Sequence, residues 1–344
     1  MLTGFFICSS SQASQPLSAN QICRVESIMA TAWSICLYDT GKTRAELDKA
    51  IDLGMEEIKR IDRWMSEWKP ESEISMINSN AGIKPVKVSD EAVQVLSLCL
   101  DQSEKSGGAF DISFNTFFGQ YNWKKGHEKF PSEAKIKELL PLVNYKNIIV
   151  DKTAKTVFLK NKGMKIGLGG MGQGYAVDKV VELLRPIKIQ SGYVDGSGDT
   201  YFWGRKPNGK LWTVGVGDPR LKQGDTSKSV VYKLYITDMA VTTAGDTEHF
   251  FVRHGKRFHH IIDPQTGYSA DRSAQVTAFC KTATLCDLSD DTVFILGPEK
   301  GKKFAEDNKI DAVIVDPNGK ITLTKGLKPI ETKWGPALEM LPTN

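Results

Sequence analysis

The sequence predicts an α+β fold. Segments with helical periodicity and segments with strand-like alternation occur in separate blocks along the 344-residue chain, without the regular βαβ succession of a parallel sheet. From residue 192 onward, short strand-like runs follow one another with turns between them, for example GYVDGSGDTYFWG and HFFVRHG. No stretch of linker-like composition divides the chain, so we expect residues 21–344 to form a single domain.

Five segments are expected to be helical. Residues 43–65 place apolar side chains at three- and four-residue spacing, with Thr43 in the N-cap position. Residues 89–106 follow Ser89 in the same way and end at Gly107. The other helices are expected at 132–140, 174–184 and about 282–296.

Strands are expected before and after the first glycine-rich segment. The alternating run MATAWSICLYD (29–39) carries Trp, Ile and Leu and reads as a strand. Further strands are expected at 146–151, 156–160, 164–166 and in DAVIVD near residue 311.

Composition excludes two classes of function. The 45 basic and 41 acidic residues are interspersed and leave a formal net charge of +4, with no dense basic block that would indicate nucleic-acid binding. No apolar run approaches the roughly 20 residues needed to span a bilayer, so a transmembrane helix is not expected.

The first 20 residues are excluded from the predicted fold. Leu2 to Cys8 is a short apolar run, and Ser11-Gln12-Ala13 resembles a cleavage site of an export signal, although a basic start is missing. Export with cleavage after Ala13 is the favoured interpretation. Lipidation of Cys8 and a disordered tail are the alternatives.

The six cysteines, at positions 8, 23, 36, 99, 280 and 286, show neither C-x-x-C nor zinc-type spacing. We expect isolated buried thiols. A disulfide between Cys280 and Cys286 in an oxidising compartment is the alternative.

A glycine loop precedes the expected helix 174–184. The run IGLGGMGQGYAVDKV, from Ile166, contains Gly167, Gly169 and Gly172 in the G-x-G-x-x-G pattern of dinucleotide-binding folds. Its context does not fit that fold, because the preceding strand is short and the required acidic residue about 20 positions on is displaced into another glycine-rich loop. The remaining interpretations are a backbone cradle for a phosphate or pyrophosphate and tight backbone packing.

Two carboxylates lie four residues apart on the last expected helix. Asp287 and Asp291, in TLCDLSDDTVFILG, fall on one helix face, where like charges repel unless a cation lies between them. Mg²⁺ prefers such oxygen ligands, and a solvated acidic face is the alternative. Asp290 is expected to point elsewhere.

Taken together, the motifs resemble the ApbE-type FAD:protein FMN transferases, or flavin transferases, from Met29 to about Asp316. MATAWSICLY is similar to the opening Met-Gly-Thr segment of that family, and DRWMSEWKPESEISMIN is similar to its next motif. The later motifs follow in the family's order: GAFDIS, IGLGGMGQGYAVDKV, DGSGDTYFWG, VTTAGDTEHFF and HHIIDPQTG.

The resemblance implies a tunnelling-type (T-fold) architecture with an internal duplication. It implies that the protein binds FAD, cleaves its pyrophosphate with Mg²⁺ and joins FMN by a phosphoester to a Thr or Ser hydroxyl of a target flavoprotein, releasing AMP. Such flavinylation targets are typically subunits of membrane redox complexes. The expected location is therefore the periplasm or the periplasmic side of the inner membrane.

The resemblance also assigns roles to residues of this sequence. His260 would accept the proton of the target hydroxyl, which suits an imidazole near its ordinary pKa, and a structural hydrogen bond is the alternative role. His259 is expected to face outward. The residues expected to contact FAD are Met29, Trp68, Ala109, Phe110, Asp111, Gln173, Thr243 and Ile262. The expected metal ligands are the Gly170 carbonyl, Asp287 and Asp291.

Four positions depart from the family pattern. Gly167 stands where an Asp is usual, Gln173 where a Lys or Glu is usual, Ala244 where a Ser is usual, and Asp291 where a Thr is usual. The additional carboxylate should tighten Mg²⁺ binding or favour a second ion. An FAD pyrophosphatase that releases FMN and AMP, and a non-catalytic FAD-binding protein, are therefore alternative functions.

Overall fold

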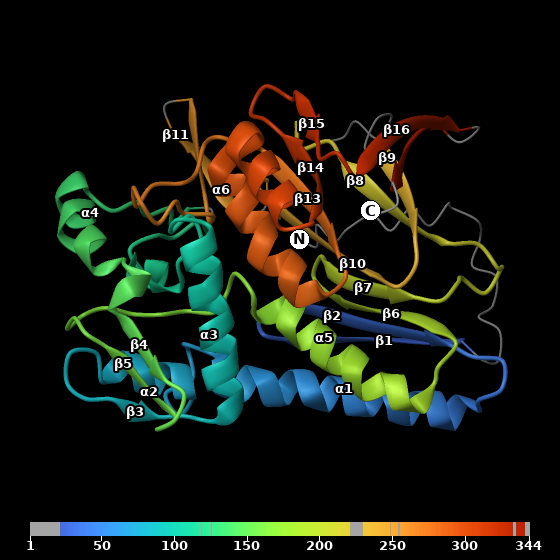
Figure 1. The fold of residues 1–344 in the computed structure, drawn as a ribbon, viewed down its shortest axis with the longest axis horizontal. Helices are drawn as coiled ribbons and strands as arrows, with labels where there is room; N and C mark the ends of the chain where they lie inside the picture. The colour runs from blue at the N-terminus through green and yellow to red at the C-terminus, as the bar shows by residue number, and fades with distance from the viewer. Residues whose placement is uncertain are drawn as a thin grey trace.

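The computed structural model describes residues 21–340 apart from 118, 125, 221–229, 248, 254 and 333–334. The expected N-terminal segment, with Cys8 and Ala13, lies outside the described residues. The described chain has the α+β fold that the sequence predicts, with helices and antiparallel strands in separate blocks (Figure 1).

An eight-stranded sheet forms the centre of the molecule, and each neighbouring pair of its strands is antiparallel. In spatial order its strands are β1 (Gln21–Ile28), β2 (Thr31–Tyr38), β6 (Ser191–Gly196), β7 (Asp199–Trp203), β10 (Met239–Gly245), β13 (Gln275–Cys280), β14 (Asp311–Val315) and β15 (Ile321–Leu323).

Three long helices cover one face of this sheet: α1 (Arg44–Met65), α5 (Gly172–Leu184) and α6 (Ala283–Asp307) (Figure 1). A four-stranded sheet lies against the other face and consists of β16 (Leu327–Thr332), β17 (Gly335–Met340), β9 (Val230–Ile236) and β8 (Trp212–Gly217). Side chains alternate between the two interfaces, because Ala278 packs toward the helices and its neighbour Phe279 toward the four-stranded sheet.

The remaining elements lie beside the helical layer or at its edge. They are α2 (Glu73–Ser79), α3 (Asp90–Lys105), α4 (Glu133–Leu139), the small sheet β3 (Val86–Lys87), β5 (Thr156–Leu159) and β4 (Ile148–Asp151), and the hairpin of β11 (Phe250–Arg253) and β12 (Lys256–His259). Short 3₁₀ helices occupy Ile112–Phe117, Leu140–Leu142, Tyr145–Asn147 and Arg185–Ile187.

The two halves of the large sheet have related connectivity. In the first half, α1 and α5 lie in the chain between the pairs β1–β2 and β6–β7. In the second half, α6 lies between β10–β13 and β14–β15, with β11 and β12 inserted. This strand-pair, helix, strand-pair order is the pattern that an internal duplication produces.

Capping explains why the helices begin where the sequence predicts. Thr43 accepts a hydrogen bond from the Glu46 backbone, and the Glu46 side chain accepts one from the Thr43 backbone. Ser89 caps α3 and Thr282 caps α6 in a similar way. The helix predicted to end near 296 is interrupted at Gly297, where φ is 80°, and then continues to Asp307.

Two predicted strands need correction. Met29 and Ala30 do not begin a strand but form the turn between β1 and β2, with φ of 52° and 58°. β1 itself was not predicted. Residues 164–166 belong to no strand, so the glycine loop lacks the preceding buried strand of a dinucleotide-binding fold.

The expectation of isolated thiols is wrong for two cysteine pairs. Cys23 and Cys36 are register partners of β1 and β2 and form a disulfide. Cys280 and Cys286 form a second disulfide. Cys99 is a buried free thiol. Within the described part of the chain, no helix has the length and apolar character needed to cross a membrane.

The turn at Met29 and Ala30 gives a stability prediction. Both residues are in the left-handed region, which costs residues with a Cβ about 1–2 kcal/mol each. We expect Ala30→Gly to raise the free energy of unfolding by about 0.5–1 kcal/mol in urea titrations. The control Ala32→Gly lies inside β2 and should lower it by a similar amount. Equal destabilisation by both changes would contradict this account of the turn.

Candidate functional site

Two cavities lie on either side of the glycine loop. The acidic cavity, defined by its lining residues Asp199, Asp287, Asp290 and Asp291, has a volume of about 300 Å³. The Trp68 cavity, which Met29 and Trp68 line, has a volume of about 400 Å³. Gly169 and Gln173 line both cavities, so the loop forms the wall between them.

The structure brings together the residues that the sequence singled out. Those in the acidic cavity are Ala109, Phe110, Asp111, Gly170, Gln173, Thr243, His260, Ile262, Asp287 and Asp291. Met29 and Trp68 lie in the other cavity, where Trp68 leaves 73% of its surface exposed. Their roles toward a ligand stay predictions.

Hydrogen bonds from two asparagines hold the start of the glycine loop. The Asn78 side chain accepts from the Ile166 backbone N–H at 2.7 Å and donates to the Ile166 carbonyl at 2.8 Å. Asn115 donates to the same carbonyl at 3.0 Å. A Cβ on Gly167 would lie only 2.7 Å from Asn115 Cγ, so an aspartate at position 167 would require Asn115 to move.

Further along, the loop leads into a close contact between α5 and α6. The Gly174 N–H donates to Asp287 Oδ2 at 2.8 Å. A Cβ on Gly174 would lie 2.4 Å from the Ala283 carbonyl oxygen, so only glycine permits this approach. At Gly169, by contrast, a Cβ would meet nothing within 4 Å. Tight packing and an open backbone are therefore both properties of this loop, at different glycines.

Four carboxylates form an acidic cluster, which we define as Asp199, Asp287, Asp290 and Asp291. Burial raises the pKa of Asp287 to about 7, with the Gly174 hydrogen bond opposing this shift and the Asp291 charge adding to it. Burial and the neighbouring carboxylates also raise the pKa values of Asp199 and Asp290 well above normal.

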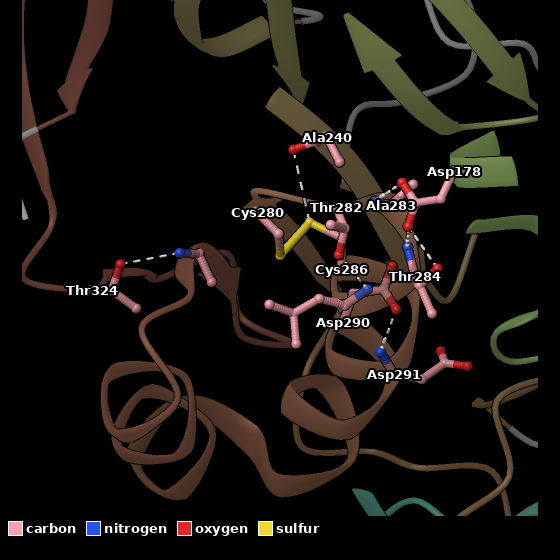
Figure 2. Close-up of a disulfide and its surroundings, with 12 residues drawn as sticks. Asp178, Ala240, Cys280, Thr282, Ala283, Thr284, Cys286, Asp290, Asp291 and Thr324 are labelled. Atoms are coloured by element: carbon pink, nitrogen blue, oxygen red, sulfur yellow. Dashed lines mark hydrogen bonds between the residues drawn. A yellow bond between two sulfur atoms is a disulfide. The ribbon is translucent and has the colours of Figure 1, made fainter. Parts of the chain in front are cut away.

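The orientation of Asp290 differs from the one that the sequence predicts. Its buried carboxylate lines the acidic cavity instead of pointing elsewhere. The reason is helical geometry, since residues three apart lie on the same face as residues four apart, and Asp290 follows Asp287 by three. Figure 2 shows Asp290 and Asp291 on one turn of α6, where the Asp291 N–H donates to Asp290 Oδ1 at 2.6 Å.

Three carboxylates of the cluster have no cationic partner in the described part of the chain. Among the described residues, no Lys or Arg forms an ion pair with Asp199, Asp287 or Asp290. In the same part of the chain, His, Cys, Asp and Glu side chains form no ready-made group of three metal ligands. A metal ion here would need backbone oxygens and water in addition to carboxylates. The Gly170 backbone lies beside Asp291, because a Cβ built on Gly170 would be 3.3 Å from Asp291 Oδ2.

The two histidines differ from expectation. His259 is buried, not outward-facing, and its Nε2 lies 2.6 Å from the Ala270 carbonyl oxygen. His260 lines the acidic cavity, and burial together with the nearby His249 and His259 lowers its pKa to about 3. Its Nδ1 is buried and has no hydrogen-bond partner in the described structure. His260 is therefore a neutral imidazole at pH 7.

Asp111 has a positioning role that the sequence did not reveal. Its Oδ1 accepts from the Ser113 N–H and hydroxyl, and its Oδ2 accepts from the Tyr145 N–H at 2.8 Å. These bonds fix the backbone of the segment that carries Ala109 and Phe110 beside the acidic cavity.

Comparison with known proteins identifies the family of this chain. A model of the ApbE family matches residues 29–314. The chain belongs to the ApbE family.

Curated relatives named FAD:protein FMN transferase share about a quarter of their residues with this chain. It is 29% identical over 269 residues to the FAD:protein FMN transferase of Klebsiella pneumoniae, covering 78% of this chain and 82% of that protein. It is 27% identical over 319 residues to the FAD:protein FMN transferase of Treponema pallidum, covering 88% and 87%.

Solved ApbE structures share the fold. The ApbE protein of Thermotoga maritima matches with a TM-score of 0.79 at 27% identity, covering 89% of this chain and 97% of that chain. The flavinyl transferase ApbE of Pseudomonas stutzeri matches with a TM-score of 0.76 at 25% identity, covering 89% and 95%.

Sequence reasoning missed three residues of the site. Asp199 lies in the DGSGDTYFWG motif, whose second aspartate was a usable signal. Gly174 follows the recognised glycine pattern by two residues. Asp178 accepts from the Ala283 and Thr284 N–H groups, both at 2.8 Å, and no local sequence signal indicates this contact between α5 and α6.

The glycine contacts give a second stability prediction. We expect Gly174→Ala to lower the free energy of unfolding by about 1–3 kcal/mol, because its Cβ would overlap the Ala283 carbonyl. Gly169→Ala, the control in the same loop, should change it by less than about 0.5 kcal/mol. Thermal or urea unfolding monitored by circular dichroism measures both. A tolerated alanine at 174 would contradict the close approach of α5 to α6.

Proposed function

We propose that the protein transfers FMN from FAD to a Thr or Ser hydroxyl of an acceptor flavoprotein, with Mg²⁺ and with release of AMP. The observation that carries the proposal is the glycine loop between two cavities, with the acidic cluster and a neutral histidine in one of them. Membership of the ApbE family and relatives named FAD:protein FMN transferase support it.

The two cavities suit a molecule with two flat ends and a charged centre. FAD has this form, since a pyrophosphate joins its isoalloxazine and adenine ends. The backbone at Gly169 is open, and the loop leads directly into the N-terminus of α5, where N–H groups favour anions. The exposed face of Trp68 offers a stacking surface for a ring in the second cavity.

The acidic cluster fits a magnesium ion better than it fits an empty site. Several buried carboxylates raise one another's pKa, and a divalent cation removes that repulsion. Asp287, Asp291 and the Gly170 carbonyl would hold it, with water in the other positions. When bound, Mg²⁺ would offset the charge of the pyrophosphate and of the departing AMP.

His260 would accept a proton in the reaction. The acceptor oxygen forms a bond to the FMN phosphorus, the bond from that phosphorus to the AMP phosphate oxygen breaks, and the hydroxyl proton passes to His260. A low pKa keeps the imidazole unprotonated at neutral pH, and a bound pyrophosphate raises its proton affinity because negative charge favours imidazolium.

Hydrolysis of FAD is the second candidate reaction, because Asp199 and Asp290 add carboxylates near His260 that could orient a water molecule. The third candidate is a non-catalytic FAD-binding protein. The proposed acceptor is an exported subunit of a membrane redox complex. Two disulfides support an oxidising location such as the periplasm.

One experiment separates the three functions. Purified protein is incubated with FAD, Mg²⁺ and a recombinant redox-complex domain that carries an acceptor Thr. The masses of all products are then measured by mass spectrometry. We expect the acceptor to gain one FMN and AMP to appear in equal amount. Free FMN with AMP and an unlabelled acceptor would indicate hydrolysis, and unchanged FAD would indicate binding alone.

Asp287→Asn tests the metal assignment. Removal of one charge from the cluster should lower the rate of FMN transfer at least about 100-fold, with a higher Mg²⁺ requirement. The control is Asp307→Asn, an exposed change at the end of the same helix, which should leave the rate unchanged. Full activity of Asp287→Asn would exclude Asp287 as a metal ligand.

His260→Gln tests the proton acceptor. The change should lower the transfer rate about 10²–10⁴-fold while the affinity for FAD, measured by flavin fluorescence, stays within about twofold. His127→Gln, at an exposed position, is the control. An undiminished rate in His260→Gln would assign His260 the purely structural role.

A further inference from the structure

A disulfide anchors the turn of α6 that presents the acidic cluster. Cys280 is the last residue of β13 and Cys286 lies in the first turns of α6, with 5.4 Å between their Cα atoms (Figure 2). The bond therefore joins the helix to the central sheet. The residue after Cys286 is Asp287.

The same turn has a second, non-covalent anchor. Asp178 of α5 accepts hydrogen bonds from the N–H groups of Ala283 and Thr284 and from the Thr284 hydroxyl, at 2.8, 2.8 and 2.6 Å. Asp178 holds the side of the turn that faces α5, whereas the disulfide holds it to β13. Figure 2 shows both anchors around the first turn of α6.

The turn carries carboxylates that repel one another whenever they are ionised, as they must be to bind a metal ion. Asp287, Asp290 and Asp291 of α6 line the acidic cavity together with Asp199, and three of the four side chains are buried. A helix base that is fixed keeps the ionised carboxylates within reach of one metal ion. Displacement of Asp287 would also break its hydrogen bond with Gly174, at the start of α5.

We propose that the Cys280–Cys286 disulfide is a positioning element for the metal site, so that the oxidised protein binds Mg²⁺ tightly and the reduced protein binds it weakly. This inference rests on the proposed function, in which the acidic cluster holds Mg²⁺. Its consequence is that efficient FMN transfer is confined to an oxidising compartment.

The redox step is a thiol–disulfide exchange. The two cysteine thiols lose two protons and two electrons to a disulfide of another protein, which becomes a dithiol, and the Cys280–Cys286 bond forms. Both cysteines are buried in the folded protein, so a reductant reaches them only after local opening. The oxidation state of this cysteine pair is therefore set in the compartment where the chain folds, and the disulfide does not exchange rapidly afterwards.

The second disulfide supplies a matched control. Cys23 and Cys36 join β1 to β2, and neither residue lines the acidic cavity or the Trp68 cavity. The test compares Cys280→Ala/Cys286→Ala with Cys23→Ala/Cys36→Ala in the full chain. Isothermal titration with MgCl₂ alone gives the metal affinity without any need for turnover.

We expect the Cys280→Ala/Cys286→Ala protein to bind Mg²⁺ about tenfold more weakly, as for loss of other groups that orient metal ligands. The Mg²⁺ affinity of the Cys23→Ala/Cys36→Ala control should stay within about twofold of that of the unchanged protein. In activity assays the half-saturating Mg²⁺ concentration should rise by the same factor, with little change in kcat at saturating Mg²⁺. A general loss of stability would lower activity in both variants. It would not raise the half-saturating Mg²⁺ concentration while leaving kcat unchanged.

A second measurement tests the inference if the Cys280→Ala/Cys286→Ala variant does not fold. Reduction of the Cys23→Ala/Cys36→Ala protein opens only the Cys280–Cys286 bond, and peptide mass mapping counts the thiols in the sample used for titration. An unchanged Mg²⁺ affinity after reduction, free thiols at Cys280 and Cys286 in the protein as isolated, or no Mg²⁺ binding at all would overturn the inference. Mg²⁺ binding without FMN transfer would instead contradict the proposed function and leave this inference standing.

Discussion

The site depends on the contact between Gly174 and Asp287. The hydrogen bond between them joins the N-terminus of α5 to the first turns of α6, and the missing side chain of Gly174 lets the two backbones meet. The glycine loop is thereby placed beside the acidic cluster. If the helices were further apart, the loop would still separate two cavities, but the carboxylates would lie away from a ligand on it.

The structure gives a physical reason for two of the expected departures from the family pattern, at Gly167 and Asp291. Asn115 fills the space beside Gly167, so an acid at that position would require Asn115 to move, whereas Asp291 places a carboxylate on α6. Charge is thus concentrated on the helix instead of the loop. A rigid helix with fixed anchors is a suitable support for such repelling groups.

The sequence predicted what depends on local pattern and on the order of motifs. Helix ends at Thr43 and Ser89 follow from capping, and the cavity residues follow from the family resemblance. It did not predict what depends on tertiary contact. The buried state of His259 and the low pKa of His260 arise mainly from neighbours that are not adjacent in sequence.

The central claim is that the glycine loop holds a pyrophosphate between two ring sites. A crystal structure with FAD and Mg²⁺ tests it most directly. The account predicts the pyrophosphate at Gly169 and Gly170, one ring system in each cavity and a metal ion in contact with Asp287. A complex with both ring systems in one cavity, or with the pyrophosphate and metal away from this loop, would contradict it.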